Sequence, residues 1–175
     1  MTNRPTLPLK AVLLIAGILI TVIPAFAQSA QVAKSFEQNK ANYTREHFAS
    51  GEDASSGYDY LFYKSRAKIV KVRSIWSASY TKELRIEDLY FNGDAIVLLR
   101  RLSGNKGQLR ALIKGQNLPL VLKDELNFAE SKLVSWTDDR RSVLRTDPRW
   151  DETEKATVEH ANAVLESYQW LKENK

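Results

Sequence analysis

The stretch from Leu84 to Leu102 reads LRIEDLYFNGDAIVLLRRL, and it decides the fold. Two segments rich in aliphatic and aromatic residues, 84–91 and 95–102, flank the dipeptide Asn92-Gly93. Asn-Gly between two such segments is the strongest short-range signal for a β-hairpin with a two-residue loop of type I′. The stretch therefore predicts two antiparallel strands joined by a tight turn.

The same hairpin pattern recurs along the chain. Residues 87–97 align without gaps with residues 124–134, and in both segments two acids, a Leu and a Phe precede the turn while two aliphatic residues follow it. Tyr60–Tyr63 and Ile69–Val72 look like a third copy with a longer turn. Because sequential strands usually pair with their neighbours, three such hairpins predict an antiparallel meander of about six strands.

Helices are expected at both ends of this sheet. Gln28–His47 has apolar residues at helical spacing, and the small polar run Ala49–Gly57 predicts a flexible loop after it. Asp147-Pro148 is a typical helix start, and the segment after it carries one apolar stripe that must pack on the sheet. The sequence thus predicts an α+β domain in which 28–57 and 58–175 form one unit.

Two further apolar segments lie between the second and third hairpins. Leu109–Ile113 and Leu118–Leu122 flank Gly115, and we expect both to extend the strands of the sheet. Pro119 indicates an edge or the start of a strand, because proline cannot donate a hydrogen bond to a neighbouring strand.

The N-terminus has the pattern of a secretory signal. A short basic segment precedes the apolar run Ala11–Ile23, Pro24 breaks it, and Ala25–Ala27 supplies the small-x-small pattern of a cleavage site. The alternative is an uncleaved membrane anchor, but a spanning helix needs about 20 apolar residues. We therefore expect 1–27 to be removed, with export to the periplasm or the medium and no membrane span in the mature chain.

Composition argues against several classes of function. The chain has no Cys and two His, which excludes a disulfide framework, thiolate metal sites and a Cys nucleophile. We found no metal, phosphate-loop or nucleophile pattern, so we expect no catalytic residue, metal or cofactor. The net charge of +5 falls to +3 without Arg4 and Lys10 of the signal, which is too small to indicate a nucleic-acid partner.

One group of basic residues is the candidate binding site. A loop at Asn92-Gly93 places Arg85 directly opposite Arg100, and like charges that face each other destabilise a sheet. Such a patch would bind an anionic ligand or an acidic partner surface. The alternative is that Glu83 and Glu87 neutralise it across the strands. The candidate residues are Lys71, Arg73, Arg85 and Arg100.

The repeated hairpins resemble a widespread class of exported bacterial proteins. These carry hairpins of the type Tyr-Phe-x-x-Gly-Lys-Leu-Ile after a signal peptide, and the likeness rests on Leu89–Val97 and its echo Leu126–Val134. It covers roughly 58–172 and departs from the pattern at Ala129-Glu130, where the glycine turn is missing. The resemblance implies export and a meander sheet, and it brings no established activity.

These observations favour an exported, non-enzymatic binding module of the periplasm or cell envelope. Its partner would be a protein, an envelope component or a small ligand bound on the sheet. The alternative is a periplasmic inhibitor of a hydrolase that acts through a protruding loop, either Ser103–Gly107 or Asp138–Arg141. The oligomeric state is left open.

Overall fold

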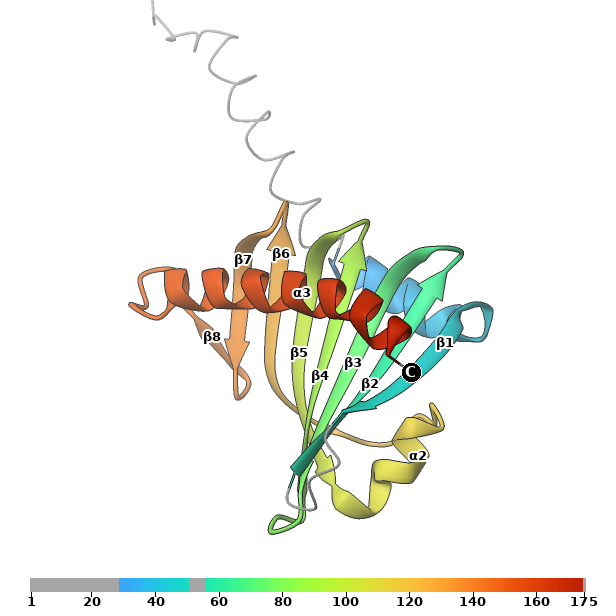
Figure 1. The fold of residues 1–175 in the computed structure, drawn as a ribbon. Coiled ribbons are helices and arrows are strands. Elements are labelled where there is room, and N and C mark those ends of the chain that lie inside the picture. The colour runs from blue at the N-terminus through green and yellow to red at the C-terminus, as the bar shows by residue number, and fades with distance from the viewer. Residues whose placement is uncertain (1–28, 51–55, 175) are drawn as a thin grey trace, which may run out of the picture.

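Consecutive hairpins build a single antiparallel sheet of eight strands in the order β1 to β8 (Figure 1). The computed structural model describes residues 29–50 and 56–174, so the predicted signal peptide and residues 51–55 of the predicted loop lie outside the described residues. The N-terminal helix α1 and the long C-terminal helix α3 pack on the sheet. The predicted α+β meander is confirmed.

The strands are β1 (Thr44–Ser50), β2 (Ser56–Ser65), β3 (Lys68–Ala78), β4 (Glu83–Asn92), β5 (Ala95–Asn105), β6 (Val121–Ala129), β7 (Lys132–Asp138) and β8 (Arg141–Val143). The helical segments are α1 (described over 29–38), η1 (Lys40–Asn42), η2 (Lys106–Gln108), α2 (Leu109–Ile113) and α3 (Trp150–Glu173).

The three predicted hairpins share a loop length and a register shift. Each has a two-residue loop, at 66–67, 93–94 and 130–131. Each also has a one-residue register shift shortly before the loop, at Tyr63/Lys64, Tyr90/Phe91 and Asn127/Phe128. The sequence repeat is therefore a structural repeat, and the expected longer turn in the first copy was wrong.

The central loop sits one residue later than expected. Asn92 pairs with Ala95, so the two loop residues are Gly93 and Asp94. Gly93 has a φ of 64° whereas Asp94 has a negative φ, which is the pattern of a type II′ turn. Gly93 adopts the left-handed conformation at the first loop position without steric cost, and Asn92 is left free to pair in the strand.

The later loop and the register shift at Tyr90/Phe91 make the predicted pairing of β4 with β5 wrong. Arg85 lies opposite Ser103, three positions beyond the expected partner Arg100. Arg100 lies opposite Asp88 instead. The expected like-charge pair does not form.

Three segments differ from the sequence-based expectation. The N-terminal helix ends at residue 38, and the rest of the predicted helix Gln28–His47 holds the short helix η1 and the start of β1. Leu109–Ile113 is helix α2 instead of a strand, because the capping box of Asn105 and Gln108 begins a helical turn just before it. β8 adds a short edge strand directly after the predicted loop Asp138–Arg141, whose last residue it includes.

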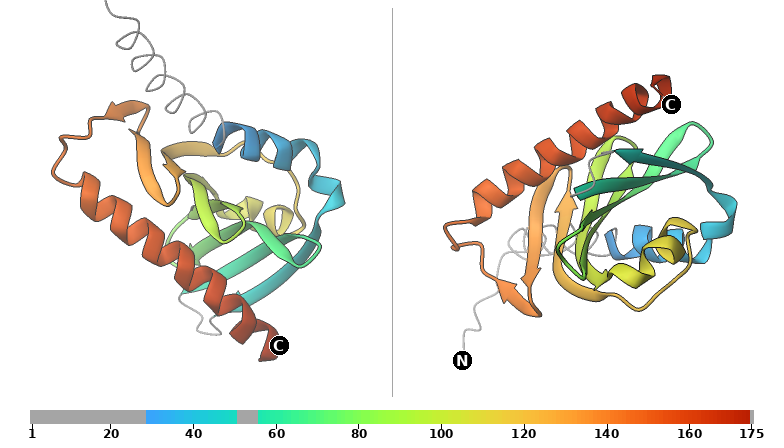
Figure 2. Two further views of the ribbon diagram at one scale, coloured as in Figure 1. Left: turned by 90° about the horizontal axis from the view of Figure 1, so that it is seen from above. Right: turned by 60° about the horizontal axis from the view of Figure 1, so that its bottom comes forward.

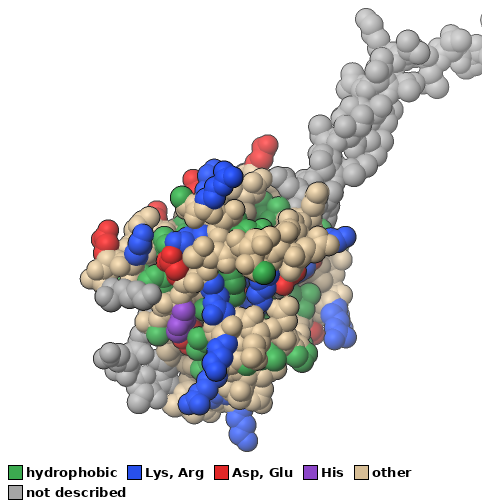
Figure 3. Space-filling model, turned by 90° about the vertical axis from the view of Figure 1, so that its right-hand side faces the viewer, with side chains coloured by type: hydrophobic (Ala, Val, Ile, Leu, Met, Phe, Trp, Pro, Cys, Tyr) green, Lys and Arg blue, Asp and Glu red, His purple; other side chains and the backbone are tan. Residues whose placement is uncertain are grey.

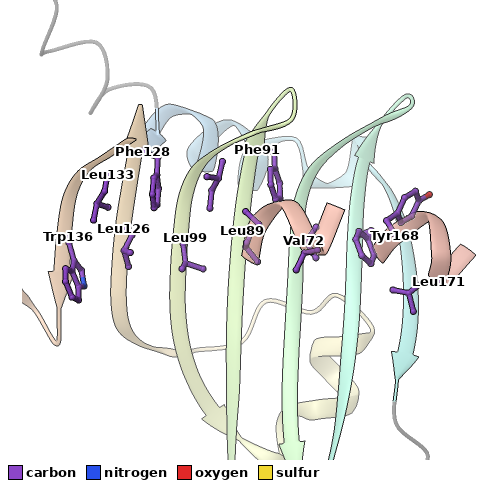
Figure 4. Close-up of a cluster of buried hydrophobic side chains, with 14 of the residues drawn as sticks. Val72, Leu89, Phe91, Leu99, Leu126, Phe128, Leu133, Trp136, Tyr168 and Leu171 are labelled. Atoms are coloured by element: carbon purple, nitrogen blue, oxygen red, sulfur yellow. The ribbon is translucent and has the colours of Figure 1, made fainter. Parts of the chain in front are cut away.

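Helices cover both faces of the curved sheet. Figure 2 shows the sheet curling around α1 and α2 on its inner face, while α3 crosses the opposite, outer face. One row of paired positions crosses six strands beneath α3 and forms the centre of the outer core (Figure 4). Its members are Phe62, Val72, Leu89, Leu99, Leu126 and Trp136.

The inner face carries a second apolar core. Phe36 of α1 and Leu112 of α2 pack there against Leu61, Ile86 and Tyr90 of the sheet. Among the described helices, none is long and apolar enough to cross a membrane.

Candidate functional site

Two of the predicted cations form a charge row on the inner face with the acids of neighbouring strands, buried at Arg73 and Asp88 and partly exposed at Arg100 and Glu125. Arg73, Asp88, Arg100 and Glu125 are consecutive partners across β3 to β6. Arg73 donates two hydrogen bonds of 2.6 Å, from Nε and Nη2, to the two carboxylate oxygens of Asp88. Arg100 Nε donates a 2.8 Å bond to Glu125 Oε2. Each Arg of the row is therefore paired with a carboxylate.

Lys71 lies one residue row away and is almost fully buried, with 2% of its surface exposed. Its Nζ lies 2.9 Å from Asp88 Oδ2 and 3.4 Å from Glu37 Oε1 of α1, and it donates a 2.9 Å bond to the hydroxyl of Tyr90. The ring of Phe36, 4.7 Å from Nζ, closes the site from the helix side. α1 thus supplies both an acid and an aromatic lid to this lysine.

Burial and charge act in opposite directions on these groups. Burial disfavours the charged carboxylate of Asp88, but Lys71 and Arg73 outweigh it and hold the pKa of Asp88 well below its usual range. Burial lowers the pKa of Lys71, and the nearby Asp88 opposes that change. Burial also raises the pKa of Tyr90 far above its usual range, with the charge of Asp88 adding to the effect. Tyr90 therefore remains a neutral hydrogen-bonding partner.

Arg85 does not join this group. It lies on the outer face, where its guanidinium stacks 4.9 Å from the ring centroid of Trp76. The structure therefore brings Lys71, Arg73 and Arg100 together and leaves Arg85 apart. Glu87, one of the acids expected to neutralise the patch, is also on the outer face, 3.0 Å from His160 Nε2.

Two cations that the sequence analysis missed lie where the inner face meets the β1 edge. Lys40 Nζ donates a 3.1 Å bond to the carbonyl of Gly115 and a 2.6 Å bond to Asn117 Oδ1. The Arg45 guanidinium packs on the same glycine, because a Cβ at Gly115 would lie 2.0 Å from Arg45 Nη1. We call Lys40 and Arg45 the β1-edge cations.

The β1-edge cations have no ion-pair partner among residues 29–50 and 56–174. Burial lowers the pKa of Lys40, and the positive charges of Arg73 and Arg45 lower it further while Glu37 opposes them. Buried Lys71 and Arg73 and the two β1-edge cations carry four positive charges. The nearby carboxylates of Asp88 and Glu37 carry two negative charges, which leaves an excess of two positive charges. Figure 3, which faces the β1 side, shows Lys and Arg side chains gathered over it.

A second surface feature lies at the lower end of the outer face. It is a wide, open depression of about 420 Å³. It adjoins Arg85 through the paired residue Ser103. Its polar lining residues are Lys82, Glu83, Ser103, Asn105 and Gln108. Within the described part of the chain, no group of three or more His, Asp or Glu residues could hold a metal ion.

Comparisons of the chain with protein-family models, with curated proteins and with solved structures give no match. What the surface binds must therefore be inferred from its charges and its geometry.

Proposed function

We propose that this chain is an exported, non-enzymatic binding module of the periplasm or cell envelope, and that it binds an acidic partner surface at the β1 edge. The observation that carries the proposal is the pair of β1-edge cations without a carboxylate partner. The sequence-based hypothesis of an anion-binding patch is kept, but its centre moves from Arg85 and Arg100 to Lys40 and Arg45.

The buried network explains why these two charges remain available. Both carboxylate oxygens of Asp88 contact Arg73 or Lys71, so Asp88 acts on Lys40 only through its charge and forms no ion pair with it. Lys40 is held in place by the carbonyl of Gly115, so little side-chain freedom is lost when it meets a partner. A carboxylate from a partner would restore charge balance in a partly desolvated site, where such a contact is stronger than in water.

Removing the β1-edge cations should weaken binding of an acidic peptide. We expect the double variant Lys40→Gln/Arg45→Gln to bind an acetylated hexaglutamate peptide about tenfold more weakly than the unaltered protein at low salt, because two charge contacts are lost. Isothermal titration calorimetry measures the affinity, and rising salt should weaken the unaltered protein's binding as well.

The matched control is Lys123→Gln/Arg145→Gln, which removes the same net charge from exposed positions far along the sheet. It should leave the peptide affinity nearly unchanged. If both double variants lose affinity equally, only the net charge matters and the proposed site is wrong.

Export has a separate test. Expression of the full chain in a bacterium should yield a mature protein that begins at Gln28, and mass spectrometry of the periplasmic fraction detects it. A lysine at the first small position of the predicted cleavage site, Ala25→Lys, should block processing. Recovery of an unprocessed, membrane-bound chain from the unaltered sequence would contradict the prediction.

Inhibition of a hydrolase is the second candidate function, and one observation favours the segment Asp138–Arg141. Both loop residues of this β7–β8 hairpin, Asp139 and Arg140, are exposed and have positive φ, which defines a tight protruding turn. Ser103–Gly107 is not such a loop, because it runs from β5 directly into η2. Replacing Asp139-Arg140 by Asn-Gly would keep the turn and should abolish inhibition of a periplasmic hydrolase that binds through it.

A further inference from the structure

β1 is an edge strand whose open side pairs with no described strand. Its register with β2 runs over seven residue pairs, from Thr44 to Ser50, and the sheet order ends at β1. Such an edge presents unpaired N–H and C=O groups that can accept another extended segment. Addition of a peptide strand to an open edge is a common mode of recognition, in which the main chain supplies affinity and the side chains supply specificity.

Contacts to α3 and β2 hold this edge strand in place. Glu46 of β1 bonds to Lys64 of β2, and it accepts a 2.8 Å hydrogen bond from the hydroxyl of Tyr168 on α3. Lys64 donates a 2.7 Å bond to the same hydroxyl, which closes a three-residue latch. On the inner face, His47 Nε2 lies 2.7 Å from Asp59 Oδ1 of β2. The edge is therefore ordered before any partner arrives, which reduces the entropy lost on binding.

We propose that β1 accepts an extended acidic segment of a partner protein as a ninth strand of the sheet. This inference rests on the proposed function and specifies how the acidic partner binds. An added strand lies about 4.8 Å from β1, and every second side chain of it points to the inner face. Acidic residues at alternate positions would therefore face Arg45 and Lys40, the charges that lack a partner.

A second copy of this chain fits the edge less well. Antiparallel pairing of β1 with another β1 brings Arg45 of both copies to the same face, without an added carboxylate for the β1-edge cations. Like charges that face each other destabilise a strand pair. An acidic segment from a different protein removes the excess positive charge, whereas self-pairing doubles it.

The test compares two peptides with the same charge and leaves the protein unaltered. One has the sequence Glu-Val-Glu-Val-Glu-Val-Glu, and the other has the same sequence with an N-methyl group on every residue, so that it has no backbone N–H to donate to a neighbouring strand from either edge. We expect the first peptide to bind about tenfold more tightly, and to slow amide hydrogen exchange in β1 at least severalfold, whereas the methylated peptide does neither.

The outcomes separate the two proposals. If both peptides bind equally and β1 exchange is unchanged, but Lys40→Gln/Arg45→Gln still weakens binding, strand addition is wrong and the acidic-partner site stands. If the double variant binds both peptides as well as the unaltered protein does, the proposed function fails. Concentration-dependent protection of β1 without peptide, together with a dimer in analytical ultracentrifugation, would assign the edge to a second copy and overturn the inference.

Discussion

The substitution Asp88→Asn is expected to destabilise the fold by about 3–5 kcal/mol, the cost of breaking a buried ion pair by removing one partner. Asp88 is 2% exposed and is the shared partner of Arg73 and Lys71. Without its charge, two buried cations remain on the inner face with only Glu37, at 3.4 Å from Lys71, close to either of them. Urea denaturation followed by tryptophan fluorescence measures the loss.

The matched control is Glu125→Gln in the same residue row. Arg100 and Glu125 also form an ion pair, but their side chains are 32% and 29% exposed, so water screens the interaction. We expect this variant to lose only about 0–1 kcal/mol. Equal losses in the two variants would show that burial of the Asp88 network does not determine its contribution.

The pH dependence of the Asp88 network follows from the direction of its pKa shifts. The folded pKa of Asp88 is lower than its unfolded value, so its stabilising effect is complete above the unfolded pKa and is lost as pH falls through the folded pKa. The unaltered protein should therefore keep this contribution at neutral pH and lose it only in strong acid.

The Asp88→Asn variant should respond to base instead. Lys71, whose pKa burial already lowers, loses its main acidic partner in the variant, so its folded pKa falls further below the unfolded value. The unfolded chain then binds more protons than the folded one, and stability rises with pH above the folded pKa. Denaturation midpoints at pH 7 and about pH 9 test this, and an unchanged difference from the unaltered protein would contradict it.

The repeated hairpins could be predicted because each is a local pattern. Leu89–Val97 and Leu126–Val134 carry the same order of acids, Leu, Phe and aliphatics, and they share even the register shift before the loop. The register could not be predicted as well. Asn92-Gly93 is compatible with a loop at either position, and a shift of one residue in the loop plus the extra residue Val97 on β5 moves every later partner.

The N-terminal region shows a different reason for error. Tyr43 and His47 are four residues apart, which fits a helical stripe, but Phe48 is buried beneath α3 and alternation along the strand places His47 on the inner face. Short segments of this kind fit both helical and strand periods, and tertiary packing decides between them.

The β1-edge cations were hidden from the sequence for a related reason. Lys40 reaches a carbonyl 75 residues away, at Gly115, and this contact depends on α2 ending at Ile113, two residues before that glycine. Leu109–Ile113 has the composition of a strand and was expected to extend the sheet. With that expectation, Gly115 would not lie beside β1. Only the fold places these two unpaired charges on one glycine.

The substitution Leu99→Ala is expected to cost about 2–5 kcal/mol, the range for a Leu truncated in a well-packed core. Leu99 is fully buried on β5, between Leu89 and Leu126 in the residue row beneath α3. The cost should lie in the upper part of this range, because α3 cannot easily move to fill the cavity. The helix is fixed near both ends, by Trp150 against Trp136 and by Tyr168 in the latch with Glu46 and Lys64.

Leu122→Ala on β6 is the control, since this leucine is already 39% exposed and should lose less than about 1 kcal/mol. Releasing the latch tests the explanation. In the background Tyr168→Phe, which removes the hydroxyl that bonds both Glu46 and Lys64, α3 has more freedom to settle into the cavity, so Leu99→Ala should cost less than it does alone. Strictly additive losses in this double-mutant cycle would show that the latch does not hold α3 over the core, and that the cavity cost is set by the sheet alone.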